Sequence, residues 1–66
     1  MIELEVNGEP KKTDATTVAT LIEELGLAGQ AVAVELNHAV VPRQQHAETE
    51  INSGDKIELV TLVGGG

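Results

Sequence analysis

The stretch IELVTLVGGG at residues 57–66 decides how the rest of the chain is interpreted. Its first seven residues are mostly apolar or β-branched, which is typical of a strand. The glycines that follow have no side chains to pack and lose the most backbone entropy on ordering, so they do not serve stability. Either residues 64–66 are an incidental frayed end, or they form a thin extended tail that carries the α-carboxylate of Gly66 into another protein.

The chain has 66 residues, enough for one small domain that buries only about 60% of the surface of its unfolded form. We therefore expect residues 1–63 to form a single domain without a deep active site, and residues 64–66 to form a flexible tail. The absence of Cys excludes a disulfide framework, a thiolate zinc site and a cysteine nucleophile. No apolar run approaches the ~20 residues of a membrane span, and Met1 leads directly into a strand pattern, so we expect a cytoplasmic protein with no membrane partner.

The chain is strongly acidic. Eleven acidic residues against four basic ones give a net charge of -7, and there is no aromatic residue. Such a chain repels phosphate backbones and offers no platform for stacking bases, so nucleic acid is not an expected partner. Two interpretations of the acidity stay open: a partner with a basic docking surface, or solubility alone.

The first part of the chain predicts a hairpin. Apolar and polar residues alternate over residues 2–7, which is the pattern of a strand buried on one face. Asn7 and Gly8 suit the positive φ angles of a two-residue type I′ turn. Residues 11–13 predict a short polar strand, whose lysines fit an exposed sheet edge because charge there discourages unwanted pairing.

One amphipathic helix of about nine residues follows. Its apolar stripe consists of Val18, Leu21, Ile22 and Leu25. Thr16 or Thr17 is the expected N-cap, and Gly26 stands where a left-handed residue ends a helix. Leu27 is expected to contact Ile22 in a Schellman ending. So short a helix is marginal in water, so it must lie on a sheet.

The second half predicts three further strands, at residues 30–36, 39–41 and 56–63. Asn37 and His38 form the turn between the first two, and Pro42 ends the second. Residues 43–52 are polar and irregular. The order of elements predicts an α+β domain with the β-grasp (ubiquitin-like) fold, a mixed sheet of about four or five strands with one amphipathic helix packed on one face.

A single helix leaves the other face of the sheet to solvent or to a partner. If Ile57 and Leu59 point toward the helix, then Val60 and Leu62 point to the open face beside the tail. We interpret these two residues as a docking surface for a partner. The alternative is that the strand twists at its end and buries them.

Outside the tail, the sequence shows no pattern typical of a metal site, a catalytic pair or a nucleotide-binding loop. His38 and His46 are expected to be solvated imidazoles in a turn and a loop, and nothing near them has metal-ligand spacing. A catalytic carboxylate pair needs a concave, desolvated site, and no such site is indicated for the candidates Glu23, Glu24, Glu48 and Glu50. No glycine-rich loop joins a strand to a helix with a following Lys, so the chain is not expected to bind nucleotide itself.

The remaining chemistry is that of the Gly66 carboxyl group. With an ordinary pKa of about 3.3 to 3.7, this group is ionised at neutral pH and is a poor electrophile. Joining it to AMP would create an acyl phosphate anhydride with a good leaving group. The ATP site and the attacking nucleophile must come from partners.

Three stretches of the chain resemble the thiamine-biosynthesis sulfur carrier family (ThiS). They are TVATLIEELG at residues 17–26, VAVELNHAVVPR at residues 32–43 and the stretch from Gly54 to Gly66. Two positions depart from the family. Thr20 stands where the family often has Glu, which would remove a capping-box partner, and His46 stands where many members have Trp.

The resemblance implies a mechanism. An adenylating enzyme similar to ThiF or MoeB uses ATP and Mg²⁺ to form an acyl-adenylate on Gly66. Sulfur from a persulfide donor converts it to a thiocarboxylate, and a thiazole synthase similar to ThiG accepts that sulfur for the thiazole of thiamine. Gly65 and Gly66 are then the reactive end and Gly64 their lead-in. The chain itself is a co-substrate, not an enzyme, and binds no cofactor or metal.

Other functions fit the same tail. The small subunit of molybdopterin synthase shares the fold and the activation chemistry but is usually longer. A ubiquitin-like protein modifier would pass its activated Gly66 to a lysine amine. A plain binding module with an inert tail is the third alternative.

Overall fold

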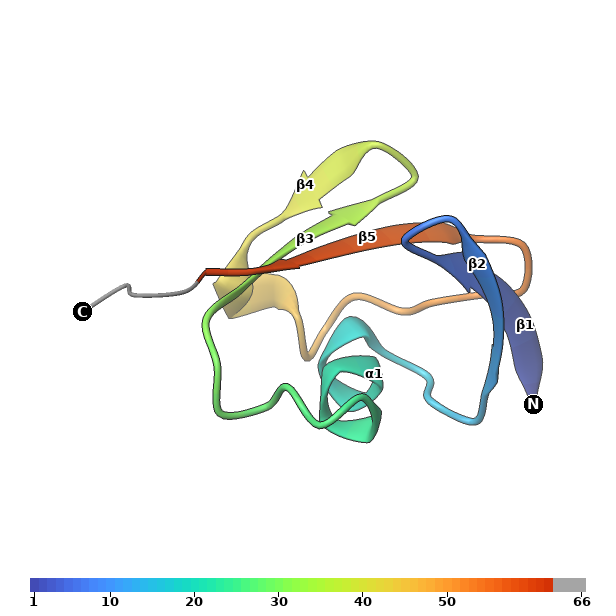
Figure 1. Cartoon of the computed structure of the whole chain (residues 1–66), viewed down its shortest axis with the longest axis horizontal. Coiled ribbons are helices and arrows are strands. Elements are labelled where there is room, and N and C mark those ends of the chain that lie inside the picture. The colour runs from blue at the N-terminus through green and yellow to red at the C-terminus, as the bar shows by residue number, and fades with distance from the viewer. Residues whose placement is uncertain (63–66) are drawn as a thin grey trace.

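The computed structural model describes residues 1–62 and has a five-stranded sheet with one α-helix (Figure 1). The elements are β1 Ile2–Val6, β2 Glu9–Thr13, α1 Val18–Glu24, β3 Val32–Leu36, β4 Ala39–Val41, the 3₁₀ helix η1 Arg43–Gln45 and β5 Lys56–Thr61. The strand order is β2-β1-β5-β3-β4, with β1 and β5 parallel and the other neighbours antiparallel. The predicted β-grasp sheet, with its last strand beside its first, is confirmed. The predicted tail at residues 64–66 lies outside the described residues.

Both predicted hairpin turns are present. Asn7 and Gly8 have φ angles of 52° and 84°, and Asn37 and His38 have 52° and 72°. The first turn is only two residues long, so pairing resumes at once with Glu9 opposite Val6. Strand β2 is therefore longer than the predicted residues 11–13. It includes a proline because β2 is an edge strand, where a missing donor is tolerated.

Helix α1 begins and ends with local hydrogen bonds. The N-cap is Thr17, and the backbone N–H of Gly26 donates to the Glu23 carbonyl while that of Leu27 donates to the Ile22 carbonyl, each at 3.0 Å. This is the predicted Schellman ending, with Gly26 at φ 78°. The helix has seven residues and not the expected nine, because Leu25 is already its C-cap.

The expected loss of the capping box at Thr20 is wrong. The Thr17 backbone N–H donates to the Thr20 hydroxyl at 3.0 Å, and the Thr20 backbone N–H donates to the Thr17 hydroxyl at 3.2 Å. A threonine hydroxyl thus reaches back to the N-cap as a Glu carboxylate would. The helix start is fully capped in spite of the departure from the family pattern.

The core lies between α1 and the inner face of the sheet. Its buried members are Leu4, Val18, Leu21, Ile22, Val34, Val41, Ile51, Ile57 and Leu59. Ile51 comes from the stretch that the sequence marks as polar and irregular. That stretch is fixed to the start of α1, since the Val18 N–H donates to the Thr49 carbonyl at 2.9 Å and the Ile51 N–H donates to the Thr16 carbonyl at 3.0 Å.

Leu21→Ala is expected to lower the free energy of unfolding by about 2 to 5 kcal/mol. The Leu21 side chain has no exposed surface, so truncation removes apolar contacts and leaves a cavity under the sheet. Urea unfolding of both proteins measures the difference. A loss below about 1 kcal/mol would show that the core closes over the missing atoms.

Glu24, at the C-terminal end of α1, makes the stability of the protein depend on pH. The Thr13 hydroxyl donates to Oε1 of Glu24 at 2.7 Å and holds the pKa of Glu24 below its ordinary value of 4.5, and Lys11 Nζ, 3.4 Å from Oε2, adds to the lowering. Because the folded-state pKa is lower, this stabilisation is present above about pH 4.5 and is lost as the pH falls through the folded-state pKa. Glu24→Gln is expected to remove part of the acid sensitivity, measured by urea unfolding at neutral pH and at about pH 3. Equal acid sensitivity in both proteins would contradict it.

Candidate functional site

Strand β5 presents two faces. Ile57 and Leu59 point into the core with 1% and 8% of their surface exposed, whereas Val60 and Leu62 are 59% and 55% exposed. The predicted alternation is confirmed, and the end of the strand does not bury the two outer residues. Figure 1 shows that the described end of β5 lies at the opposite extreme of the molecule from the N-terminus. The predicted tail residues Gly64, Gly65 and Gly66 follow directly in sequence but lie outside the described part.

A third apolar side chain joins this face from β4. Val40 is 73% exposed and stands opposite Glu35 of β3, while Ala33 of β3 stands opposite Val60. Side chains two residues apart on one strand share a face, so these positions form one surface. We call Val40, Val60 and Leu62 the open-face patch. Sequence reasoning missed Val40, because the pairing of β4 with β3 places it there and its short strand carries no clear alternation.

Acidic side chains adjoin the open-face patch. Glu35 and Glu58 stand directly opposite each other in the β3–β5 ladder, an arrangement of like charges that costs stability. The ion pairs of residues 1–62 join the N-terminus to Asp14 and Lys11 to Glu24, so neither of these two glutamates is neutralised by an ion pair in that part of the chain. In the described residues the open face therefore combines an apolar surface with two glutamates that no ion pair neutralises.

The two turn asparagines hold β5 in place. The Asn7 side chain donates to the Leu59 carbonyl at 3.2 Å and accepts from the Leu59 N–H at 2.8 Å, as a strand backbone would. From the other side, the Asn37 side chain accepts from the Lys56 N–H at 2.9 Å and donates to Asp55 at 3.1 Å. The sequence indicates these residues only as turn formers. Their second role is to fix the strand that leads to residue 66.

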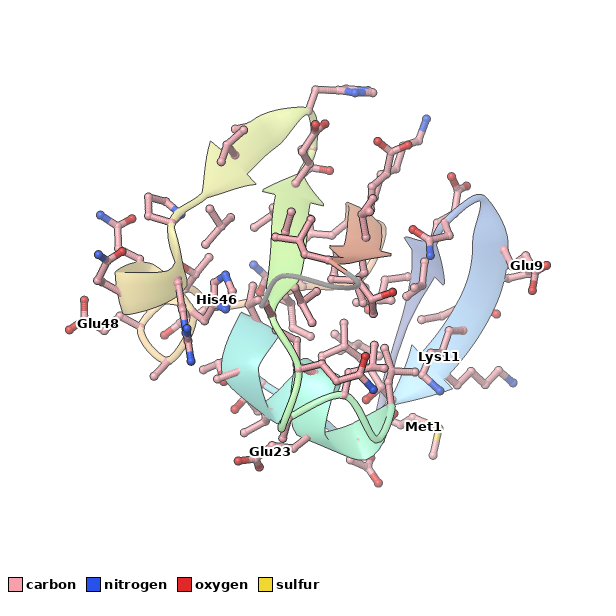
Figure 2. All side chains as sticks on the ribbon, turned by 60° about the vertical axis from the view of Figure 1, so that its left-hand side comes forward. Met1, Glu9, Lys11, Glu23, His46 and Glu48 are labelled. Atoms are coloured by element: carbon pink, nitrogen blue, oxygen red, sulfur yellow. The ribbon has the colours of Figure 1, made fainter. Side chains whose placement is uncertain are left out.

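His46 is buried, although its polar surroundings in the sequence predict exposure to solvent. It is only 9% exposed, and its Nε2 lies 3.1 Å from the Val41 carbonyl oxygen. Its backbone carbonyl accepts from the N–H of Ala19 at 3.0 Å, which ties η1 to the start of α1. Figure 2 shows the ring between η1 and α1. The expectation of a solvated imidazole is wrong for His46 because the loop folds back on the helix, whereas His38 is exposed in its turn as expected.

A hollow of about 250 Å³ lies beside this histidine, with Glu23 and Arg43 among its lining residues. In residues 1–62 no three His, Cys, Asp or Glu side chains gather where they could hold a metal ion. The same part of the chain contains no helix that is both long and apolar enough to cross a membrane. Of the carboxylates considered as acid–base candidates, Glu23 and Glu24 lie on α1, and Glu48 and Glu50 lie in the loop before β5.

Known proteins resemble this chain over almost its whole length. The family model described as the ThiS family matches residues 4–66. The sulfur carrier protein ThiS of Bacillus subtilis is 34% identical over 65 residues, which cover 96% of this chain and 98% of that protein. The crystal structure of a thiamine biosynthesis protein (ThiS) from Geobacter metallireducens agrees with a TM-score of 0.81 and 37% identity, covering 98% of this chain and all of that one.

A larger protein also contains a similar segment. A thiazole synthase from Paramagnetospirillum magneticum is 42% identical over 66 residues, which cover 98% of this chain but only 20% of that protein. This chain thus spans about a fifth of the length of that relative. The family match, the relatives of equal length and the shared fold lead to one conclusion: the chain belongs to the ThiS family.

Proposed function

We propose that this protein is a sulfur carrier for the biosynthesis of the thiazole moiety of thiamine, with the Gly66 carboxyl group as its reactive end. The observation that carries the proposal is the match to the ThiS family, which extends through residue 66 and so includes the glycines. Matches to ThiS sulfur carriers over nearly their full length support it. The chain acts as a co-substrate and not as a catalyst.

The chemistry of the carboxyl group requires activation by a partner. A carboxylate is a poor electrophile, so an oxygen of Gly66 attacks the α-phosphorus of ATP and pyrophosphate leaves. A persulfide sulfur then attacks the acyl carbon and displaces AMP. Reduction of the resulting acyl disulfide by a thiol leaves the thiocarboxylate. An adenylating enzyme supplies the ATP and Mg²⁺ site, and glycine at the acyl position leaves the carbonyl carbon uncrowded.

The open-face patch and its acidic neighbours give a docking surface for that enzyme. Val60 lies on β5 and Leu62 directly follows it, so a partner seated on them binds four to six residues before Gly66 along the chain. Within residues 1–62, Glu35 and Glu58 make no ion pair, which favours a partner with basic residues around an apolar centre. Opposite potentials also speed the encounter of the two proteins.

The acceptor of the sulfur is a thiazole synthase. Support comes from the relative of that name, in which a segment is similar to this whole chain. A carrier segment and an acceptor enzyme in one polypeptide would keep the thiocarboxylate close to its target. We place the reaction in the cytoplasm.

Reconstitution with a ThiF-like adenylating enzyme and Mg-ATP tests the proposal. We expect exchange of labelled pyrophosphate into ATP that depends on the carrier, and a thiocarboxylate when a persulfide donor and a thiol are added. Transfer of the sulfur to a molybdopterin precursor, or attachment of Gly66 to lysine amines, would instead indicate the small subunit of molybdopterin synthase or a protein modifier. A chain that supports no exchange at all contradicts the proposed activation.

A further inference from the structure

The outer half of β5 has a neighbouring strand on one side only. On the β1 side, the ladder contains just two pairs, Glu5 with Lys56 and Val6 with Ile57. Asn7 extends it through its backbone N–H, which donates to the Ile57 carbonyl at 2.8 Å, and through its side chain at Leu59. The chain then turns back into β2. Figure 1 shows β5 continuing past this turn toward its C-terminal end.

The backbone of Thr61 faces this uncovered edge. Even-numbered residues of β5 bond on the β3 side, as shown by the Lys56 carbonyl, which accepts from the Asn37 N–H at 2.7 Å. Leu62, directly after β5, continues this pattern, since its N–H donates to the Ala31 carbonyl at 2.9 Å. Odd-numbered residues face the other way, as the bonds of Ile57 and Leu59 to Asn7 show. The N–H and C=O of Thr61 therefore point outward from the sheet, and within residues 1–62 neither makes a hydrogen bond.

The other two sheet edges carry features that block pairing, and this one does not. Strand β2 contains Pro10 and the charged residues Lys11 and Lys12. Strand β4 has only three residues and is followed by Pro42. Proline, lysine and shortness are the usual protections of an edge strand. The end of β5 and the residue after it, from Leu59 to Leu62, have no proline and no charge, so this edge is open to an added strand.

We propose that an extended segment of the adenylating enzyme adds to the sheet as a strand at this edge and pairs with the backbone N–H and C=O of Thr61. The proposal deepens the proposed function and rests on it. Thr61 lies five residues before Gly66, so a strand seated there adjoins the chain that the enzyme must draw in. Hydrogen bonds between main chains can hold the segment before the glycines in an extended conformation without side-chain contacts, which glycines cannot make.

The side chains next to this edge are compatible with such a strand. Val60 and Leu62 would flank it on the open face with exposed apolar surface, and residues of the enzyme strand on that face would extend the open-face patch. The Thr61 side chain lies on the other, helix-covered face and is half-buried. The added strand would thus lie beside the docking surface. It would also hold the end of β5 extended toward the active site of the adenylating enzyme.

Thr61→Pro tests the pairing, because proline removes the outward N–H and leaves the bonds to β3 intact. The matched control is Lys12→Pro. Lys12 lies on the edge strand β2, two residues after Pro10, and backbone groups two residues apart on a strand point the same way. The backbone nitrogen of Lys12 therefore points outward from the sheet, as that of Pro10 does. We expect both variants to retain the fold by circular dichroism. We expect Thr61→Pro to raise the KM for the carrier in pyrophosphate exchange on the order of tenfold, and Lys12→Pro to leave it unchanged.

Hydrogen exchange of the wild-type carrier gives a second measurement that does not depend on either variant. We expect the Thr61 amide to exchange rapidly in the free protein and at least about tenfold more slowly with the adenylating enzyme bound. A folded Thr61→Pro protein with wild-type KM, or a Thr61 amide whose exchange does not change on binding, overturns the edge pairing. Such a result alongside normal wild-type adenylation leaves the proposed function standing. Failure of the wild type to support exchange overturns both.

Discussion

Deletion of Gly66 is expected to abolish adenylation and thiocarboxylate formation while leaving the fold unchanged. The buried core lies between Leu4 and Leu59, so the deletion removes none of it. The shortened chain still ends in a glycine carboxylate, now on Gly65. However, that group stands one residue short, about 3.3 to 3.6 Å from the position that the enzyme expects. Since a misplacement of ~1 Å can cost about 100-fold in rate, we expect a loss of at least that size.

Pyrophosphate exchange with the adenylating enzyme measures the effect of the deletion. The matched control is Gly66→Ala, which keeps the length of the chain and adds one methyl group beside the reacting carbon. We expect it to retain more activity than the shortened chain. Thermal unfolding checks that the deletion and the wild type are equally stable. Activity retained after deletion of Gly66 would refute the assignment of the reactive end.

Replacing Val60 and Leu62 together by Asp is expected to weaken binding of the adenylating enzyme by ~30- to 1,000-fold, if each anchors the interface with about 1 to 2 kcal/mol. Both side chains are more than half exposed, so the charges reach solvent and the sheet should remain folded. They also add to the negative charge of Glu35 and Glu58 on the same face. Isothermal titration of the enzyme with the double variant measures the change in Kd.

A control must separate the place of the new charges from their number. Ala28 and Ala47 are exposed in loops outside the sheet, and replacing both by Asp adds the same two charges elsewhere. We expect that double variant to bind nearly as the wild type does. Unfolding of the Val60 and Leu62 double variant would show that these residues stabilise the sheet. Unchanged binding by the folded protein would show that the open-face patch is not the docking surface.

Much of the fold could be predicted because its determinants are local. Asn7 with Gly8 specifies a tight turn, Gly26 ends the helix, and alternation marks the strands. Contacts between distant segments could not be predicted from these patterns. The burial of His46 and Ile51 depends on how a polar loop folds over the start of α1, and polarity alone points to solvent.

The candidate site was predictable to a similar degree. The three terminal glycines are recognised directly from the sequence. The exposure of Val60 and Leu62 follows because side chains alternate along a strand and the single helix covers only one face of the sheet. To predict that Glu35 and Glu58 stand opposite each other, one must know the register of two strands that lie far apart in sequence. To predict that the backbone N–H and C=O of Thr61 have no neighbouring strand, one must know where the pairing of β1 with β5 ends. Neither property is encoded in the residue types of one stretch.

The most direct measurement is the intact mass of the protein purified from cells that make thiamine. A sulfur carrier predicts a fraction whose mass has increased by the difference between one sulfur and one oxygen atom. Fragmentation should locate that change at Gly66, and the deletion of Gly66 should remove it. Protein from such cells whose terminal carboxyl group is always unmodified, or is joined to lysines of other proteins, would contradict the sulfur carrier role.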